Sequence, residues 1–470
     1  MALPFDLIDE AKRLIRFNTV TWSSNADCAV YVGSLFRKLG LQVSYQEARV
    51  GEVLFMNVVG WVGTGKAPLL LTTHLDTVDP GNPRLWTKTG ADPWRLTVRG
   101  DTLTGLGAAD TKLDLLAKLA ALGGMKVSAL ARPIVLLGTF GEESGLRGAA
   151  RFCQGDLPRP AMALVGEPSD LSVVTRHKGL AVGQILFKTR GLLRPSSAQW
   201  LYEATLTGKA AHSSTPGLGA NAIELGLQLL QSLKKRHGKI ALLSWEGGSG
   251  HNIIPASSTI RFSLGDHPRI SVASSRPLQL KVSRLQPGWY PTLPLDDLLW
   301  SVETLRALLD PAQKEKDHAF KPPTLTWNTT LLQLTPEGWC LTFDVRPLPG
   351  QSIQRFIKSV EARLWKKMGH PGPTWQFRLE RDNPALDLER HAPLVKMAGG
   401  SCRAARLPFK IEAKAGCSEA GLYARVGIPS VVFGPGRAAG NIHQPNESVS
   451  LRQVKKAIRF YQEFIKRACF

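Results

Sequence analysis

RPIVLLGTFGEE, residues 132–143, joins an apolar run to two adjacent carboxylates. A run this apolar is typical of a strand buried on both faces of a sheet. PLLLTTHLD at 68–76 and PAMALVGEPSD at 160–170 repeat the pattern, with charged residues where the apolar run stops. DTKLDLLAKLAALGGMK at 110–126 has the pattern of a helix that begins after a glycine-rich loop. Strands that alternate with helices predict an α/β fold, with a largely parallel central sheet flanked by helices.

The pattern changes near residue 180. YEATLTGKAAHSS at 202–214 alternates like a strand with one exposed face, and NAIELGLQLLQSLKKR at 221–236 is typical of a helix. Strands covered by helices on one face indicate an α+β two-layer sandwich. The end of the chain returns to the first pattern. We therefore expect a discontinuous catalytic domain with an inserted lid domain, with the bounds 1–179 and 384–470 for the first and 180–383 for the second.

Length and composition limit the classes of protein. A chain of 470 residues is too long for one ordinary core, which agrees with two domains. It contains no run of 18 apolar residues, and its N-terminus lacks the apolar core of a signal peptide, so we expect a cytoplasmic protein without a membrane partner. The net charge of +21 would attract anions, but the basic residues are spread along the chain. No nucleic-acid-binding motif accompanies them, so no specific nucleic-acid partner is expected.

Five residues that commonly bind metals lie just beyond predicted strands or before a predicted helix. They are His74, Asp110, Glu143, Glu167 and His443. Ligands of open α/β sheets bind at the carboxyl ends of the strands. Nitrogen and oxygen ligands suit zinc, with cobalt or manganese as substitutes. The set predicts two zinc ions that share Asp110, polarise a carbonyl group and activate the water held between them.

Two further carboxylates accompany these ligands. Asp76 lies on the same side of an extended chain as His74, so one of the pair could bind metal while the other orients it. Glu142 precedes Glu143, and adjacent carboxylates repel each other unless cations compensate them. On an extended backbone the two point in opposite directions, so Glu142 could act as the general base while Glu143 binds metal.

Each of these residues also has an ordinary structural explanation. Asp110 is a residue type that caps helices, and Glu167 precedes a proline that can begin one. His443 could be an exposed histidine of a surface loop, and Glu142 with Glu143 could lie at the surface. Taken one at a time, the residues therefore leave the metal-binding interpretation open.

The order of five motifs resembles a known enzyme family. HLDTV, GAADTK, GEES, GEPSD and GPG…HQPNES are similar to motifs of the acetylornithine deacetylase, succinyl-diaminopimelate desuccinylase and carboxypeptidase G family of di-zinc amidohydrolases. The resemblance covers roughly residues 70–220 and 340–460. It implies one zinc at His74, Asp110 and Glu167, and another at Asp110, Glu143 and His443. It also implies that Asp76 orients His74, that Glu142 shuttles the proton, and that the peptide bond after Asp110 is cis.

Motifs of the predicted lid add substrate-binding residues to this resemblance. In GKAAHSSTPGLGANAIEL, His212 would reach the site of the partner subunit in a homodimer and stabilise the oxyanion. Asn252 in HNIIP would contact the substrate, and Arg346 in FDVRPLPG would clamp its carboxylate. Glu419 in CSEAG, where many relatives carry aspartate, would contact the amino acid portion of the substrate.

Within the family, the sequences of these motifs are most similar to those of acetylornithine deacetylase, so we expect hydrolysis of an N-acyl amino acid. A desuccinylase and a carboxypeptidase-like enzyme that cleaves dipeptides are the alternatives. A non-catalytic binding relative would be expected to lack a ligand or the base, and all six are present.

Two departures from the family pattern affect the predicted lid. Asn252 and Arg346 are 94 positions apart, where the family has about a dozen, and Gly265 stands at the place expected for the arginine. We interpret this as an insertion at about 265–335 that splits the lid strand. The stretch KTRGLLRPSSAQW at 188–200 is a second addition.

Overall fold

The computed structural model describes residues 5–188, 192–194, 199–211, 213–264, 277–286, 288–369 and 374–470. The chain divides into two compact units. Unit 1 is Met1–His177 with Asn383–Phe470, and unit 2 is Lys178–Asp382. The roles of these units as catalytic domain and lid remain predictions. Among the described residues, no helix combines the length and hydrophobicity needed to cross a bilayer.

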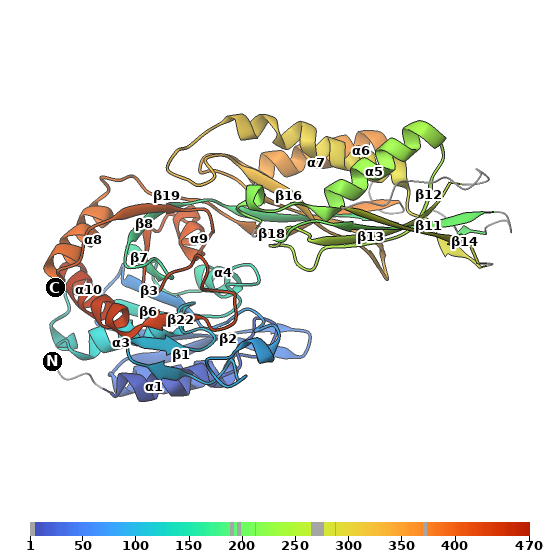
Figure 1. Ribbon diagram of the computed structural model, residues 1–470. Coiled ribbons are helices and arrows are strands. Elements are labelled where there is room, and N and C mark those ends of the chain that lie inside the picture. Colours follow the sequence, from blue (N-terminus) through green and yellow to red (C-terminus); the bar gives the residue numbers. More distant parts are fainter. Residues whose placement is uncertain are drawn as a thin grey trace. The chain divides into compact units, whose positions relative to one another are not determined.

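Unit 1 is built around a nine-stranded sheet of order β1-β2-β6-β3-β7-β21-β8-β19, with β20 beside β8 (Figure 1). Its strands are β1 (Gln42–Val50), β2 (Val53–Val62), β3 (Leu69–His74), β6 (Ile134–Thr139), β7 (Met162–Gly166), β8 (Val173–His177), β19 (Leu386–Asp387), β20 (Ile411–Lys414) and β21 (Ser430–Phe433). The four central strands β6, β3, β7 and β21 are parallel neighbours. The pairs β1–β2, β2–β6, β21–β8 and β19–β8 are antiparallel. The predicted α/β class is confirmed, and the sheet is parallel at its centre.

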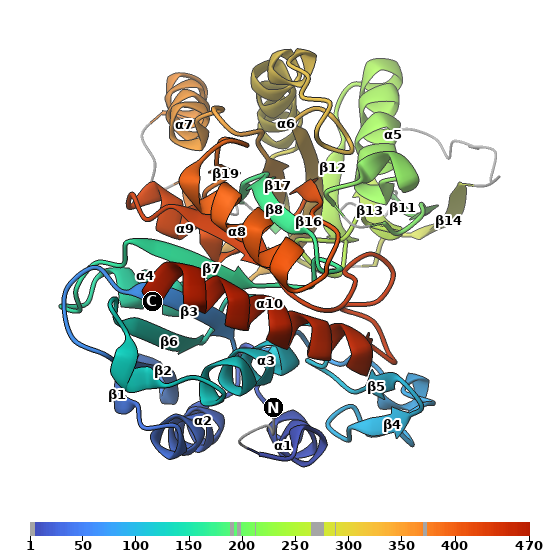
Figure 2. The same ribbon diagram turned by 90° about the vertical axis from the view of Figure 1, so that its left-hand side faces the viewer.

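Helices cover both faces of this sheet (Figure 2). They are α1 (Leu7–Ile15), α2 (Ala26–Lys38), α3 (Lys112–Gly123), α4 (Arg147–Cys153), α8 (Pro393–Ala404), α9 (Glu419–Arg425) and α10 (Leu451–Cys469). Leu69 and Leu71 of β3 belong to the core that includes α1, α2, α3, α8 and α10, whereas Leu70 belongs to the core with α4 and α9. Successive side chains of a strand point to opposite faces, which explains why the run is apolar at every position.

Short elements complete unit 1. β4 (Thr97–Arg99), β5 (Thr102–Thr104) and β22 (Ser448–Ser450) form a three-stranded sheet, and η1 (Pro83–Leu85) and η2 (Val127–Ala129) are 3-10 turns.

Unit 2 contains an eight-stranded sheet of order β14-β11-β13-β12-β16-β17-β9-β18. Its strands are β9 (Leu180–Phe187), β11 (Trp200–Thr207), β12 (Ala241–Gly247), β13 (Ser257–Ser263), β14 (Leu278–Arg284), β16 (Thr326–Thr335), β17 (Gly338–Arg346) and β18 (Trp375–Asn383). The helices α5 (Ala222–His237), α6 (Leu295–Leu309) and α7 (Ile353–Met368) lie over one face of it (Figures 1 and 2). The described part of unit 2 is therefore the predicted two-layer α+β sandwich.

The predicted insertion at 265–335 has regular structure in its described part. It forms β14, β15 (Tyr290–Pro291), α6, η4 (Pro311–Lys314) and β16. β15 pairs with β10 (Leu192–Leu193), and η3 (Pro216–Leu218) precedes α5. Thus the additional residues widen the sheet and add a helix to its covered face. Gly265 lies outside the described residues.

Candidate metal centre

The predicted ligands of unit 1 stand where neighbouring strands end. His74 is the last residue of β3, Glu167 directly follows β7, and Glu143 lies in the turn after β6. His443 lies in the loop after β21, and Asp110 precedes α3. Because β6, β3, β7 and β21 are parallel neighbours, their carboxyl ends meet at one edge of the sheet.

Asp110 lies at the centre of this cluster. Its Oδ1 is 3.1 Å from Nε2 of His74, and its Oδ2 is 3.2 Å from Nε2 of His443. Glu167 Oε1 is 3.9 Å from Nε2 of His74, and Glu143 Oε1 is 2.8 Å from Nε2 of His443. The structure thus brings all five together in two groups that share Asp110, and within each group the ligand atoms lie within 4.8 Å of one another.

Asp76 connects the end of β3 with the turn after β6. Its carboxylate accepts hydrogen bonds from the backbone N–H groups of Glu142 at 3.0 Å and Glu143 at 3.1 Å. Nδ1 of His74 lies 3.0 Å from the backbone oxygen of Asp76 and 3.6 Å from its Oδ1. The carboxylate of Asp76 therefore holds the Glu142–Glu143 turn, and its backbone oxygen is the atom nearer to the imidazole.

Glu447 is a buried residue of this region that sequence reasoning missed. Its Oε1 accepts hydrogen bonds from the backbone N–H groups of Ala109 at 2.8 Å and Asp110 at 3.0 Å. The side chain is only 1% exposed. It therefore fixes the backbone that carries Asp110, whose peptide bond to Thr111 is cis, as the resemblance implies. The available signal was its position in the HQPNES motif that also carries His443.

The acids and imidazoles of the cluster alter one another's ionisation. Burial disfavours the ionised form of Asp110, but hydrogen bonds from His443 and His74 outweigh burial and lower the pKa of Asp110. The Glu143 carboxylate raises the pKa of His443 to about 12. Burial opposes the imidazolium of His74, but hydrogen bonds with Asp110 and Asp76 hold its pKa well above the ordinary value. In the protein alone, the two imidazoles supply the positive charge that the carboxylates require.

Two other acids, Glu167 and Glu142, lie close to negatively charged carboxylates. Burial and the charge of Asp110 raise the pKa of Glu167 to about 8. Burial, Glu167 and Glu143 raise the pKa of Glu142 well above its ordinary value. Divalent cations between such carboxylates would remove the repulsion, and imidazole nitrogens with carboxylate oxygens are ligands of zinc. The donor set therefore fits two divalent metals with Asp110 shared between them.

The surroundings of Glu419 differ from the prediction that this residue contacts substrate. Its carboxylate accepts hydrogen bonds from Thr139 Oγ1 at 2.6 Å, Thr72 Oγ1 at 3.0 Å and the Tyr423 hydroxyl at 3.4 Å. The residue is 1% exposed. Three hydroxyl groups enclose the carboxylate inside unit 1, so we correct the interpretation: Glu419 supports the ends of β3 and β6 from the interior.

A second buried ionic group supports the other side of β3. Lys118 of α3 lies 2.7 Å from Oδ2 of Asp114 and donates to Thr73 Oγ1 at 2.8 Å. Thr73 precedes His74 and itself donates to Asp114 at 2.8 Å, and the Tyr461 hydroxyl donates to the other oxygen of Asp114. Lys118 and Asp114 are both fully buried. The signal in the sequence was a pair of opposite charges four residues apart in a helix whose other residues after Lys112 are apolar.

Lys118→Met is expected to lower the free energy of unfolding by about 3–5 kcal/mol, because it leaves the Asp114 carboxylate buried without its cation. Urea unfolding followed by circular dichroism measures this loss. The matched control is Asp114→Asn combined with Lys118→Met. It should lose less than the two single variants together, since neither charge is left unpaired. A Lys118→Met protein as stable as the wild type would contradict the assignment.

The predicted substrate residues of unit 2 are partly brought together. Asn252 and Arg346, 94 positions apart in the sequence, both contact Ser213. The Ser213 backbone N–H donates to the backbone carbonyl oxygen of Asn252 at 2.9 Å, and Arg346 Nη2 donates to Ser213 Oγ at 3.2 Å. His212 lies outside the described residues.

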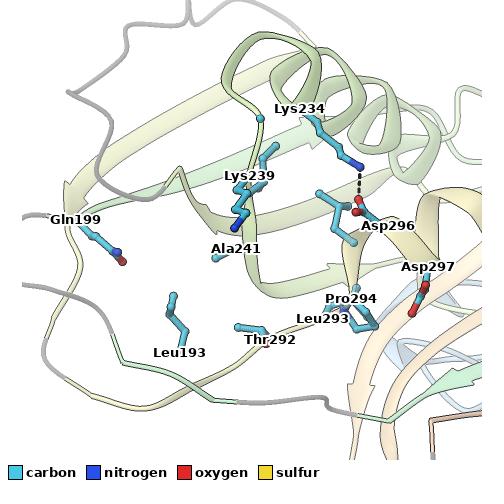
Figure 3. Close-up of a pocket in the computed structure, with 13 residues that line it drawn as sticks. Leu193, Gln199, Lys234, Lys239, Ala241, Thr292, Leu293, Pro294, Asp296 and Asp297 are labelled. Carbon is cyan, nitrogen blue, oxygen red and sulfur yellow. Dashed lines mark hydrogen bonds and ion pairs between the residues drawn. The ribbon is translucent and has the colours of Figure 1, made fainter.

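Unit 2 also contains a cavity of about 800 Å³ between the end of α5 and the beginning of α6 (Figure 3). Lys239 and Thr292 line it, and Lys234 forms an ion pair with Asp296 at its rim. No predicted ligand or substrate residue is among the residues that line it. The predicted site residues therefore lie elsewhere.

Comparison with solved structures shows the same fold in several hydrolases. Aminoacylhistidine dipeptidase from Vibrio alginolyticus matches with a TM-score of 0.63 at 15% identity, over 98% of this chain and 96% of that chain. The M20 family metallo-carboxypeptidase Sso-CP2 from Sulfolobus solfataricus matches with a TM-score of 0.57 at 15% identity, over 98% and 99%. Human carnosine dipeptidase 1 matches with a TM-score of 0.56 at 13% identity, over 97% and 95%.

The family itself follows from the sequence. A family model described as peptidase family M20/M25/M40 matches residues 70–467, which is most of the chain. The match includes every residue of the two candidate ligand groups. The chain therefore belongs to peptidase family M20/M25/M40 and is a metallopeptidase that acts on amide bonds.

Proposed function

We propose that this metallopeptidase hydrolyses the amide bond of an N-acyl amino acid, as an acetylornithine deacetylase does, with two zinc ions. The observation that carries the proposal is the position of Asp110. Its two oxygens face two different histidines, and each histidine has a further carboxylate beside it. A carboxylate shared in this way suits a pair of divalent cations.

The residues around Asp110 have separate roles in the proposed reaction. When bound, the two metals would polarise the amide carbonyl and favour attack by water near neutral pH. Glu142 accepts the proton of the attacking water and returns it to the leaving nitrogen. Asp76 fixes the backbone of Glu142 and Glu143 through two hydrogen bonds, so the base and the ligand keep a constant separation. The products are a carboxylic acid and an amino acid.

Arg346 is the proposed partner of the substrate's carboxylate, with Asn252 and His212 completing the recognition of the acyl amide. The surroundings of Arg346 in unit 2 support an anionic ligand. Burial is the main cause that lowers the pKa of His251 to about 4, and the positive charges of Arg381 and Arg346 contribute to the shift. Arg346 is 4% exposed and lies 3.2 Å from Asp344. A guanidinium held in place in this way can bind a carboxylate with little loss of side-chain freedom.

A dipeptide is the second candidate substrate. Two of the solved structures that share the fold are named dipeptidases. A dipeptide also presents an amide bond near a free carboxylate, so the same residues would serve. An N-succinyl amino acid is a third candidate. The cytoplasmic location remains a prediction from the sequence.

Removal of metal is expected to lower hydrolysis by at least about 100-fold, because the polarising charge on the carbonyl is lost. The purified protein should be treated with a chelator and assayed after addition of zinc, cobalt or manganese. The substrates should be N-acetylornithine, N-succinyl-diaminopimelate, N-acetylated neutral amino acids and dipeptides. The proposal expects N-acetylornithine to be the best substrate and metal to restore the rate. Full activity in metal-free protein would refute it, and preference for a dipeptide would replace the first substrate with the second.

A further inference from the structure

The eight-stranded sheet of unit 2 consists of two four-stranded halves that meet between β12 and β16. Counted outward from this joint, one half is β12-β13-β11-β14 and the other is β16-β17-β9-β18. Each half has an antiparallel hairpin next to the joint, β12–β13 or β16–β17. An earlier strand, β11 or β9, then pairs antiparallel with the outer strand of the hairpin. A helix precedes each hairpin, α5 before β12 and α6 before β16.

A β-bulge marks the same place in both hairpins. In β12 the register shifts just after Leu242, which pairs with Phe262. In β16 it shifts just after Thr329, which pairs with Phe343. Bulges are retained features of related sheets, so their coincidence indicates that the halves are copies of one arrangement.

Equating the two phenylalanines aligns the sequences of the two halves. FSLG at 262–265 then corresponds to FDVR at 343–346, and Gly265 takes the place of Arg346. The first half therefore carries glycine where the second carries the arginine. Conversely, the second half joins its hairpin strands through residues 336–337 alone, whereas the first half has HNIIP in that connection. Each half thus has motifs that the other half does not.

Side chains from the two halves meet at Ser213, which follows His212 in the first half. Arg346 of the second half donates to Ser213 Oγ at 3.2 Å, and Asn328 of the second half donates to the Ser213 backbone oxygen at 3.1 Å. Within the first half, the Ser213 backbone N–H donates to the backbone carbonyl oxygen of Asn252 at 2.9 Å. Ser213 is fully buried, so these contacts belong to the interior of unit 2.

The joint itself has the close packing of a domain interior. A Cβ atom at Gly248 would lie 2.0 Å from the Thr330 carbonyl oxygen, so the two backbones touch. The Asn221 side chain before α5 donates to the backbone carbonyl oxygen of Thr329 at 2.7 Å, and Thr329 Oγ1 donates to Glu224 of α5 at 2.9 Å. One hydrophobic core includes residues of both halves. Two sheets that pair and share a core in this way resemble two subunits joined by a symmetric interface.

We propose that unit 2 is a duplicated lid whose two halves complement each other within one chain. Asn252 and Ser213 come from the first half and Arg346 from the second, and His212 directly precedes Ser213 in the sequence, so one chain would supply the complete substrate-binding set. A second copy of the chain is not required. This inference rests on the proposed function for the roles of these residues, and it replaces the homodimer in which His212 reaches a partner's site.

The test combines molecular mass with rescue between inactive variants. Sedimentation of the wild type is expected to give a single chain of 51.3 kDa, with a specific activity that stays constant on dilution. His212→Ala and Glu142→Gln are then co-expressed and purified together. A site completed within one chain gives no recovered activity. Sites completed by a partner would recover about a quarter of the wild-type activity, because half of the randomly assembled dimers would contain one intact site.

Each result decides the inference. An active monomer, or a dimer without rescue, supports it. Rescue, a dimer whose activity disappears on dissociation, or full activity of His212→Ala overturns it. A wild-type protein that hydrolyses none of the substrates would refute the proposed function. In that case a mass of 51.3 kDa would still support a lid formed by a single chain.

Discussion

Asp110→Asn is expected to lower the hydrolytic rate by at least about 1,000-fold and to reduce the bound metal to less than one ion per chain. Asparagine keeps the shape of the side chain but removes the negative charge that the two candidate ligand groups share. The oxygens of Asp110 lie 3.1 Å and 3.2 Å from the imidazoles of His74 and His443, so the substitution affects both groups at once. Metal analysis of the dialysed protein and the steady-state rate measure the two effects.

The control for this variant is Asp9→Asn, which removes an exposed carboxylate from α1. Its metal content and rate should equal those of the wild type. The unfolding temperature of Asp110→Asn is expected to equal that of the wild type, because Glu447 still accepts hydrogen bonds from the backbone N–H groups of residues 109 and 110. An unchanged unfolding temperature would show that the loss of metal and rate is local to the site. Two tightly bound metals and a normal rate in Asp110→Asn would show that the carboxylate is not shared.

Glu142→Gln is expected to lower the rate by about 100-fold to 10,000-fold while the protein keeps both metals. The amide cannot accept a proton from water, but the backbone N–H of residue 142 can still donate to Asp76. The loss should therefore appear in kcat, with little change in the affinity for substrate. Rate measurements at saturating substrate, together with metal analysis, give both quantities.

Glu143→Gln is the matched comparison, since it changes the adjacent carboxylate by the same chemistry. Glu143 lies 2.8 Å from His443 and belongs to a ligand group, so its variant should lose metal. The pair of variants separates proton transfer from metal binding within one turn of the chain. Metal loss in Glu142→Gln, or an unchanged rate, would remove Glu142 from the role of general base.

Much of the fold of unit 1 could be predicted because it follows from patterns of neighbouring residues in the sequence. Apolar runs such as 134–137 and 69–71 lie in strands because burial on both faces favours apolar residues at successive positions. Metal-binding residue types that follow such runs could be assigned to one edge of the sheet, because parallel strands end together. His74, Asp110, Glu143, Glu167 and His443 do converge there.

Other features depended on contacts between distant residues. Glu419 could be read as a substrate residue from its motif, but Thr72, Thr139 and Tyr423 enclose it. Glu447 lies in the HQPNES motif, but the motif does not tell what it contacts, and its role follows from the hydrogen bonds that it accepts from the backbone of Ala109 and Asp110.

From local patterns alone, the chain could be assigned the α/β class, the strands within 68–76, 132–143 and 160–170, the helix within 110–126, and the residues available to bind metal. These follow from periodicity and from the chemistry of single side chains, which neighbouring residues encode. The three-dimensional arrangement was needed to show which acids face the two histidines, which acids are enclosed, and how the two halves of unit 2 match. Those outcomes depend on strand pairing and packing between residues far apart in the chain, and such pairing leaves no local pattern in the sequence.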